Sequence, residues 1–196
     1  MSFHTNSPAI EQLFETARSH NGWRDTPVPP ESLRELHRLA SIGPTAFNAQ
    51  PMRLVFVTTA EGRARLLPAL RPTNVDKTMS APVAAIVAYD TRFYELIPRL
   101  YHNPAAGEMF INNPQLAGSA AFRNGTLQGA YLIMAARALG LDCGPMSGFD
   151  NAKVDAEFFP DGRFKSNFLC AIGKGDPAKL FARLPRLGFD DACVVC

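Results

Sequence analysis

The sequence predicts an α+β fold in which helices dominate and strands are few. The clearest element is one long segment, 120–139, which is rich in helix formers and has almost no polar face. A helix that is apolar nearly all round belongs in the centre of a core. Three shorter runs rich in β-branched and aromatic residues, 54–58, 82–89 and 167–173, predict buried strands. No internal repeat or linker divides the 196 residues, so we expect a single domain, 1–196.

Composition and charge argue against several classes of protein. With 46% hydrophobic and 19% charged residues, the chain is ordinary globular material. A net charge of +2 without a basic run predicts no nucleic-acid partner. No apolar run is long enough to cross a bilayer, and the first residues lack the pattern of a secretory signal. We therefore expect a soluble, cytoplasmic protein with no membrane partner, and the four histidines show no metal-ligand spacing.

The other helices are placed by start and stop signals: an N-cap residue or first-turn proline before an apolar repeat, and glycine or proline after it. They are expected from Ser7 and Pro8 onward, from Pro29-Pro30-Glu31 to Gly43-Pro44, over 61–70, and, capped by Asp150, over 154–158.

The segments between these elements have weaker patterns. Residues 73–77 are expected to form a polar connection. Residues 92–122 hold two helical pieces, around 93–100 and 114–121, which flank His102-Asn103-Pro104. A long excursion of this kind between core elements predicts a lid or substrate-binding segment.

The segment 140–150 follows the central helix directly and is the strongest candidate for a binding loop. Gly140 is expected to adopt the left-handed conformation that stops the helix, and Leu141 to fold back onto its last turn. A glycine-containing loop, Pro145-Met146-Ser147-Gly148, comes next. A stiff helix followed by such a loop can hold backbone N–H groups still against a planar ligand. Met146 is expected to pack rather than to take part in chemistry.

Several catalytic motifs are incomplete in this chain. Gly173-Lys174-Gly175 lacks the third glycine and the following helix of a dinucleotide fingerprint. Ser147-Gly148 lacks the upstream glycine of a nucleophile elbow. Cys193 and Cys196 have no second pair beside them and are interpreted as a spare thiol pair on a tail. A hydrolase with a side-chain nucleophile is poorly supported.

Five segments, in order over nearly the whole chain, together resemble one known family. They are His20-Asn21-Gly22-Trp23-Arg24; Gly43-Pro44-Thr45 with Asn48 and Pro51; Asn74 with Lys77; the segment from Gly140 to Asp150; and Ala182-Arg183-Leu184-Pro185-Arg186-Leu187. On these segments the sequence resembles the FMN-dependent nitroreductases, and within them the malonic semialdehyde reductases of uracil breakdown. The resemblance implies a nitroreductase-like fold, with a central mixed or antiparallel sheet flanked by helices, in an intertwined homodimer.

The resemblance also implies an FMN site without a catalytic side chain, because hydride chemistry takes place on the flavin. The cofactor-binding candidates are Arg18, Ser19, Asn21 and Arg183 around the phosphate; Thr45, Ala46 and Asn48 from the partner subunit; Asn74 and Lys77 at the ring edge; and Pro145, Met146, Ser147 and Gly148, the last two facing N5. Lys77 is expected near N1, where it would favour the reduced flavin electrostatically. Residues 176–196 are expected to form a tail that reaches the flavin site or the partner subunit.

Several positions depart from the family pattern. Ala17 and the neutral Asn21 stand at the first and last places of the usual Arg-x-Ser-x-Arg/Lys. Ser147 replaces a frequent glutamate, and Phe181 stands where lysine is frequent, although Lys179 lies nearby. The FMN phosphate is therefore expected to be held by fewer charges than usual.

The resemblance implies a ping-pong reaction in which NADH or NADPH reduces the flavin and a small acceptor then takes the hydride. Malonic semialdehyde would become 3-hydroxypropionate, with Arg53 or Arg123 as candidate cations for its carboxylate. Nitroaromatics and quinones are alternative acceptors. A non-catalytic flavin-binding protein and a flavin-free structural dimer are the alternatives from other classes.

Overall fold

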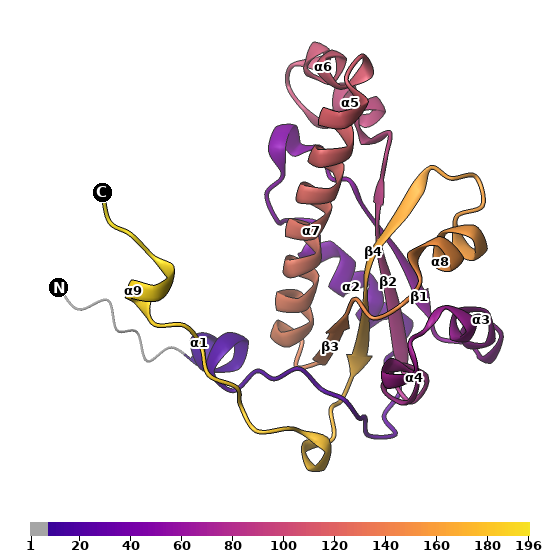
Figure 1. The fold of residues 1–196 in the computed structure, drawn as a ribbon, viewed down its shortest axis with the longest axis vertical. Coiled ribbons are helices and arrows are strands. Elements are labelled where there is room, and N and C mark those ends of the chain that lie inside the picture. The colour runs from indigo at the N-terminus through magenta and orange to yellow at the C-terminus, as the bar shows by residue number, and fades with distance from the viewer. Residues whose placement is uncertain (1–7) are drawn as a thin grey trace.

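The computed structural model describes residues 8–196, and its centre is a four-stranded antiparallel sheet (Figure 1). The strands are β1 (Met52–Val57), β2 (Val83–Asp90), β3 (Asp142–Met146) and β4 (Phe164–Gly173). They lie in the order β1-β2-β4-β3, and every neighbouring pair is antiparallel. The α+β fold with an antiparallel sheet flanked by helices is thus confirmed, and all three strands expected from apolar runs are present.

Strand β2 lies in the middle of the core because both of its faces are covered. Its side chains alternate between two apolar clusters, as the two-residue period of a strand requires. Ile86 packs with Leu66 and Val154 on one side of the sheet. On the other side, Val87 packs with Leu132 of the long helix. This burial on both faces explains why 82–89 is an almost unbroken apolar run.

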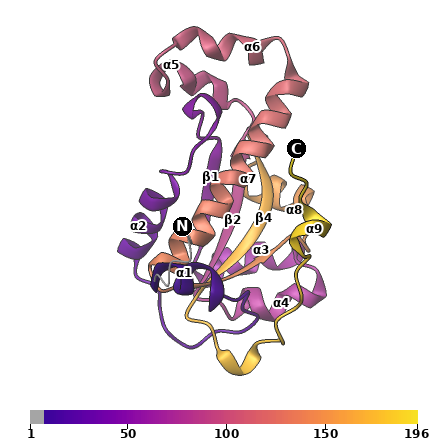
Figure 2. The same cartoon turned by 90° about the vertical axis from the view of Figure 1, so that its left-hand side faces the viewer.

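The remaining elements are helices, most of them short. Their bounds are α1 (Pro8–Ile10), α2 (Pro30–Ala40), α3 (Ala60–Leu66), α4 (Pro72–Met79), α5 (Ile97–Leu100), α6 (Glu108–Ile111), α7 (Pro114–Ala138), α8 (Asn151–Phe158) and α9 (Phe189–Ala192). Helix α7 packs with α2 against one face of the sheet, whereas α3 and α8 cover the other (Figures 1 and 2).

The long helix α7 begins earlier than the apolar run indicates. Pro114 occupies its first turn, and the Asn113 side chain accepts a hydrogen bond from the Leu116 N–H at 3.0 Å. The expectation of a separate helical piece over 114–121 is wrong, since that piece is the start of α7. The end is as expected, because Gly140 has φ +69° and the Leu141 N–H donates to the Ala136 carbonyl at 2.8 Å.

Helix α7 is not buried all round, which corrects the expectation from its apolar composition. Leu132 is fully buried, but Phe122, Leu127 and Tyr131 are 51%, 49% and 42% exposed. These three side chains, together with Ala130, form an exposed stripe that we call the α7 apolar face. At one end of this face, Phe122 packs edge-to-face against Tyr89 of β2, with ring centroids 5.8 Å apart.

Two further expectations are corrected at helix boundaries. Residues 73–77 are helical and belong to α4, which begins with Pro72 in its first turn. Of the first predicted helix, Ser7 lies outside the described residues, and the helical turns end at Glu15. Asp150 caps α8 as expected, because its Oδ1 accepts a hydrogen bond from the Lys153 N–H at 3.1 Å.

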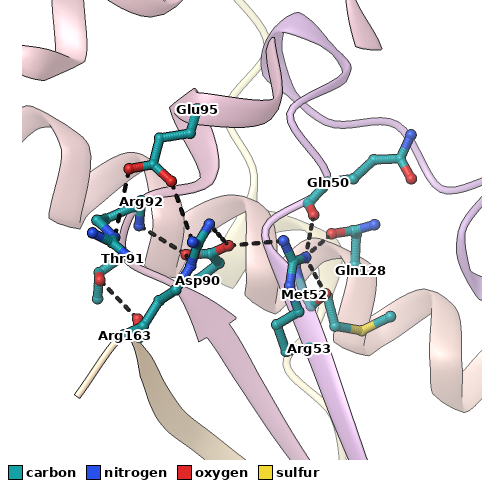
Figure 3. A network of polar contacts seen from close by, with 9 residues as sticks. All are labelled: Gln50, Met52, Arg53, Asp90, Thr91, Arg92, Glu95, Gln128 and Arg163. Carbon is teal, nitrogen blue, oxygen red and sulfur yellow. Dashed lines mark hydrogen bonds and ion pairs between the residues drawn. The ribbon is translucent and has the colours of Figure 1, made fainter. Parts of the chain in front are cut away.

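The excursion after β2 is tied to the sheet by a buried carboxylate (Figure 3). Asp90 has no exposed surface, and its two oxygens accept hydrogen bonds from the guanidinium groups of Arg53 and Arg163 at 2.8–2.9 Å. The same carboxylate accepts from the Arg92 N–H at 2.9 Å, and Glu95 pairs with Arg163 at 3.2 Å. The excursion therefore leaves the sheet from a fixed point.

The excursion and the tail lie at different ends of the molecule. Helices α5 and α6 sit beyond one end of the sheet, while the tail first turns at the opposite end and then runs up to α9 (Figure 2). The tail carries large apolar side chains that the chain itself leaves uncovered, since Phe181, Leu184 and Leu187 are 75%, 73% and 76% exposed.

Candidate functional site

The segment that begins at Ser19 lies directly beside strand β3. Ser19 forms a parallel bridge with Cys143, and the His20 N–H donates to the Cys143 carbonyl at 2.9 Å. The approach is close enough to require glycine, because a Cβ at Gly144 would lie 2.4 Å from the His20 carbonyl oxygen. The structure thereby brings together two segments that are more than a hundred residues apart in the sequence.

A cavity of about 370 Å³ opens beside this bridge and is bounded on its outer side by the tail. Its lining residues are Ala17, Arg18, Ser19, Asn21, Arg137, Phe181, Ala182, Arg183, Leu184 and Arg186. Four of them are arginines, and none is acidic. All four residues expected around the phosphate line this cavity. Such a donor set fits a phosphate, because the planar guanidinium fork matches phosphate oxygens.

Two of the arginines also join the tail to the N-terminal segment. Arg18 donates to the Phe181 carbonyl at 2.5 Å. In the reverse direction, Arg183 donates to the carbonyls of Glu15 and Ala17 at 2.5 and 3.2 Å. The tail segment is thus held across the cavity at two points.

The loop after β3 is held against helix α4. The Asn74 side chain and the Arg71 N–H both donate to the Gly148 carbonyl, at 2.8 and 3.2 Å. A Cβ at Gly148 would lie 2.3 Å from the Asn74 amide nitrogen, so this contact also needs glycine. Within the loop, Ser147 is exposed and Gly148 is partly exposed, which leaves an accessible strip of backbone beside Asn74.

Pro145 is exposed at the strand edge, whereas Met146 points into the core. Met146 packs in the cluster beneath the sheet, and its sulfur accepts a hydrogen bond from the Thr78 hydroxyl at 3.2 Å. This side chain stabilises α4 against β3 and does not face solvent.

Lys77 lies one turn after Asn74 on α4, on the same side of the helix. Its backbone carbonyl accepts a hydrogen bond from the Trp23 indole N–H at 2.8 Å, which links α4 to the segment beside β3. Burial lowers the pKa of the Lys77 amine from its ordinary value. The ammonium has lost part of its hydration, so an anion bound nearby would be favoured.

The predicted residues Thr45, Ala46 and Asn48 lie elsewhere. The Ala46 N–H donates to the Asn124 side chain at 2.8 Å, and the Asn48 amide donates to the Leu100 carbonyl at 2.9 Å. On α7, Asn124 and Arg137 are 13 residues apart (137 − 124), which corresponds to about 20 Å along the axis. A single chain therefore does not bring this loop to the arginine cavity.

This second loop has an unusual backbone. Phe47, Asn48 and Gln50 have φ of 56°, 49° and 43°, in the left-handed region that L-residues rarely adopt. Buried amides of α7 support it, since Asn124 bonds Ala46 and Gln128 accepts from the Met52 N–H at 3.0 Å. A backbone held in this strained form is typical of functional loops.

Sequence reasoning missed Asn124 and Gln128, which support this loop, as functional residues. It also missed Arg137 and Arg186, which line the arginine cavity. The two amides interrupt an otherwise apolar helix, and this interruption was the available signal. Arg53, a candidate for binding a substrate carboxylate, is instead bonded to Asp90. Arg123 lines an open groove along α7 with Phe122 and Leu127.

Within residues 8–196, no group of three or more His, Cys, Asp or Glu side chains could hold a metal ion. None of the helices in the described part of the chain is both long and apolar enough to span a membrane.

Comparison with known proteins identifies the family that the chain matches. Residues 15–174 match the profile of the nitroreductase family. A Cupriavidus pinatubonensis protein, named as a candidate NADH dehydrogenase/NAD(P)H nitroreductase, is 59% identical over 94% of this chain and 95% of its own length.

Solved structures agree with the fold. An Exiguobacterium sibiricum nitroreductase-type protein in complex with FMN has a TM-score of 0.88 at 20% identity, with 100% of both chains covered. A Staphylococcus epidermidis protein described as an NAD(P)H:FMN oxidoreductase has a TM-score of 0.82 at 19% identity, again over 100% of both chains.

Proposed function

Because the chain belongs to the nitroreductase family, we propose that it is an FMN-dependent NAD(P)H oxidoreductase. The observation that carries the proposal is the cavity of four arginines without an acidic residue. The cavity includes Ser19, which bridges Cys143 of β3, and the loop that Asn74 holds follows the end of the same strand. The phosphate of FMN suits the arginine cavity, and the edge of its ring suits the amide and ammonium donors on α4. Bound FMN would supply hydride transfer, accepting hydride from NAD(P)H and passing it to an acceptor.

Each part of the site has a separate task in binding. Arg18, Ser19 and Arg183 hold the phosphate by charge-assisted hydrogen bonds. Asn74 fixes the Gly148 carbonyl, and the accessible Ser147–Gly148 backbone lies against the reactive part of the ring. Lys77, partly desolvated on α4, stabilises negative charge at the pyrimidine edge of the ring.

We further propose that the working form is a homodimer. The 45–48 loop lies far from the arginine cavity of its own chain, so a second copy would have to bring its loop to this site. The α7 apolar face is exposed and lacks charge apart from Arg123 beside it. The tail, 176–196, exposes further apolar side chains that a second subunit would cover. The excursion 92–122 lies beside the 45–48 loop, where it would act as a lid over the acceptor.

The central test is flavin uptake followed by anaerobic reduction. Purified full-length protein reconstituted with excess FMN should retain about one flavin per chain through gel filtration and elute as a dimer. NADH or NADPH added without oxygen should bleach the yellow colour. Protein that retains flavin but is not bleached would be a flavin-binding protein without this activity. Protein that takes up no FMN would contradict the proposal outright.

The acceptor we propose is malonic semialdehyde, reduced to 3-hydroxypropionate. The sequence segments that resemble the malonic semialdehyde reductases support it, and nitroaromatic or quinone reduction is the competing activity. After anaerobic reduction, the rates at which malonic semialdehyde, a quinone and a nitroaromatic restore the colour should be compared. If the quinone and the nitroaromatic both reoxidise the flavin faster than malonic semialdehyde does, the aldehyde is not the preferred acceptor.

Replacing Lys77 by Met is expected to make bound FMN harder to reduce. One positive charge near the ring edge is worth a few kcal/mol at protein dielectric, so the two-electron midpoint potential should fall by about 30–60 mV. Dye-equilibration titration of the reconstituted protein measures this shift. Lys153→Met, which removes a lysine of α8 that donates to the Pro68 carbonyl, is the matched control and should leave the potential unchanged. Equal midpoint potentials for Lys77→Met and wild type would contradict the proposed position of Lys77 at the edge of the flavin ring.

A further inference from the structure

We propose that Arg137 is an additional ligand of the FMN 5′-phosphate and supplies the cation that Ala17 cannot. The inference rests on the proposed function, because it concerns the same cofactor. Arg137 lies in the last turn of α7, 120 residues along the chain from Ala17 (137 − 17), yet both residues line one cavity.

The geometry of Arg137 leaves part of its guanidinium group unused. Its Nη1 donates to the Leu13 carbonyl at 2.9 Å and lies 3.7 Å from the Met134 sulfur, which fixes the side chain in place. Its Nε is shielded from solvent and has no hydrogen-bond partner among residues 8–196. A buried N–H of a charged group without an acceptor is unfavourable and is rarely left so in folded proteins. Arg137 is therefore a cation that lines the cavity and is held in place by its neighbours.

The neighbouring charges favour an anion at this point. Arg18, Arg183 and Arg186 line the same cavity, and no carboxylate is among the lining residues. Four guanidinium groups in one cavity repel one another unless an anion lies between them. A phosphate, with two negative charges and several acceptor oxygens, can satisfy several forks at once.

The arginines differ in how much of their bonding the protein already uses. Arg18 and Arg183 each donate to a backbone carbonyl of the other's segment, and so they also act as a clasp for the tail. Arg186 donates to the Leu184 and Pro185 carbonyls of its own segment. Arg137 is the one that a long helix positions, so its place in the cavity does not depend on the tail.

A helix-capping role alone is the competing explanation. The C-terminal end of a helix carries partial negative charge, and an arginine in the last turn offsets it. By itself, that end of α7 would also repel a phosphate. If Arg137 only caps the helix and holds Leu13, its loss should affect the binding of any flavin equally, with or without a phosphate.

The test compares FMN with riboflavin, which has the same ring system but no phosphate. Apoprotein of the full chain is titrated with each flavin by fluorescence quenching, for wild type, Arg137→Gln and Arg137→Lys. Arg137→Gln should weaken FMN binding about tenfold or more and leave riboflavin binding unchanged. Arg137→Lys keeps the charge without the planar fork, so its FMN affinity should lie between those of wild type and Arg137→Gln. Arg38→Gln on α2, whose partner is Glu35, controls for the loss of one positive charge elsewhere and should have no effect.

The outcomes separate this inference from the proposed function. Equal weakening of FMN and riboflavin, or no change in either, would overturn the role of Arg137 and leave the flavin site standing. Wild-type protein that binds neither flavin would instead reject the proposed function itself. If Arg137→Gln does not fold, judged by its circular dichroism, Arg137→Lys decides: an FMN affinity equal to that of wild type would contradict fork-specific binding.

Discussion

Asp90→Asn is expected to destabilise the protein by about 3 kcal/mol, because it breaks a buried network of ion pairs. Asp90 is fully buried, and it neutralises Arg53 and Arg163 through three guanidinium hydrogen bonds. The amide keeps the shape of the side chain but leaves Arg53 without its carboxylate partner and leaves Arg163 with Glu95 as its remaining one. We place the value at the low end of the range for a broken buried pair because the two arginines are 25% and 24% exposed and keep some hydration.

Urea unfolding of the apoprotein measures this change, with the slope checked for two-state behaviour. The matched control is Glu95→Gln, since Glu95 pairs with Arg163 at 3.2 Å but is 42% exposed. Its loss should cost less than about 1 kcal/mol. Replacing Arg53 by Met in the Asp90→Asn background should recover part of the loss, because it removes the charge that has lost its carboxylate partner. A loss for Asp90→Asn no larger than for Glu95→Gln would contradict the structural role of Asp90.

The sequence predicted best those helices whose ends are marked by residues close by in the chain. The apolar run of α7 with Gly140 behind it, and Asp150 before α8, fix their helix ends through contacts within a few residues. Helix α4 was missed for the opposite reason. Its two buried side chains, Asn74 and Thr78, are both polar, so no apolar periodicity marks it as a helix. Polar side chains that are buried for a site hide the pattern on which prediction depends.

The Asp90 network and the arginine cavity could not be derived from sequence, because their members come from distant segments. Arg53 was proposed as a cation for a substrate carboxylate, and nothing near Asp90 or Arg163 in the sequence marks them as its partners. Arg137 reads as a cation that closes a helix. Only the antiparallel pairing of β1, β2 and β4 places the first three side by side. The flavin site itself was inferred from resemblance to a family, and the chemistry of single residues did not identify it.

Arg183→Ala is expected to weaken FMN binding about a hundredfold, more than any other single change in the cavity. Two effects add. Arg183 faces the same cavity as Ser19, where a charge-assisted contact to phosphate is worth about 1.5–3 kcal/mol. It also donates to the carbonyls of Glu15 and Ala17, so its loss frees the tail that bounds the cavity.

The two effects can be measured separately. Fluorescence titration with FMN and riboflavin reports the phosphate contact, and the rate of limited proteolysis between 180 and 196 reports the clasp. Arg183→Lys keeps a charge but loses the fork, so it should recover part of the FMN affinity and little of the protection from protease. Arg34→Ala, an exposed arginine on α2, is the matched control for both measurements. Faster proteolysis with unchanged FMN affinity would mean that Arg183 holds the tail and does not touch the phosphate. In that case Arg18, Arg137 and Arg186 would have to hold the phosphate without it.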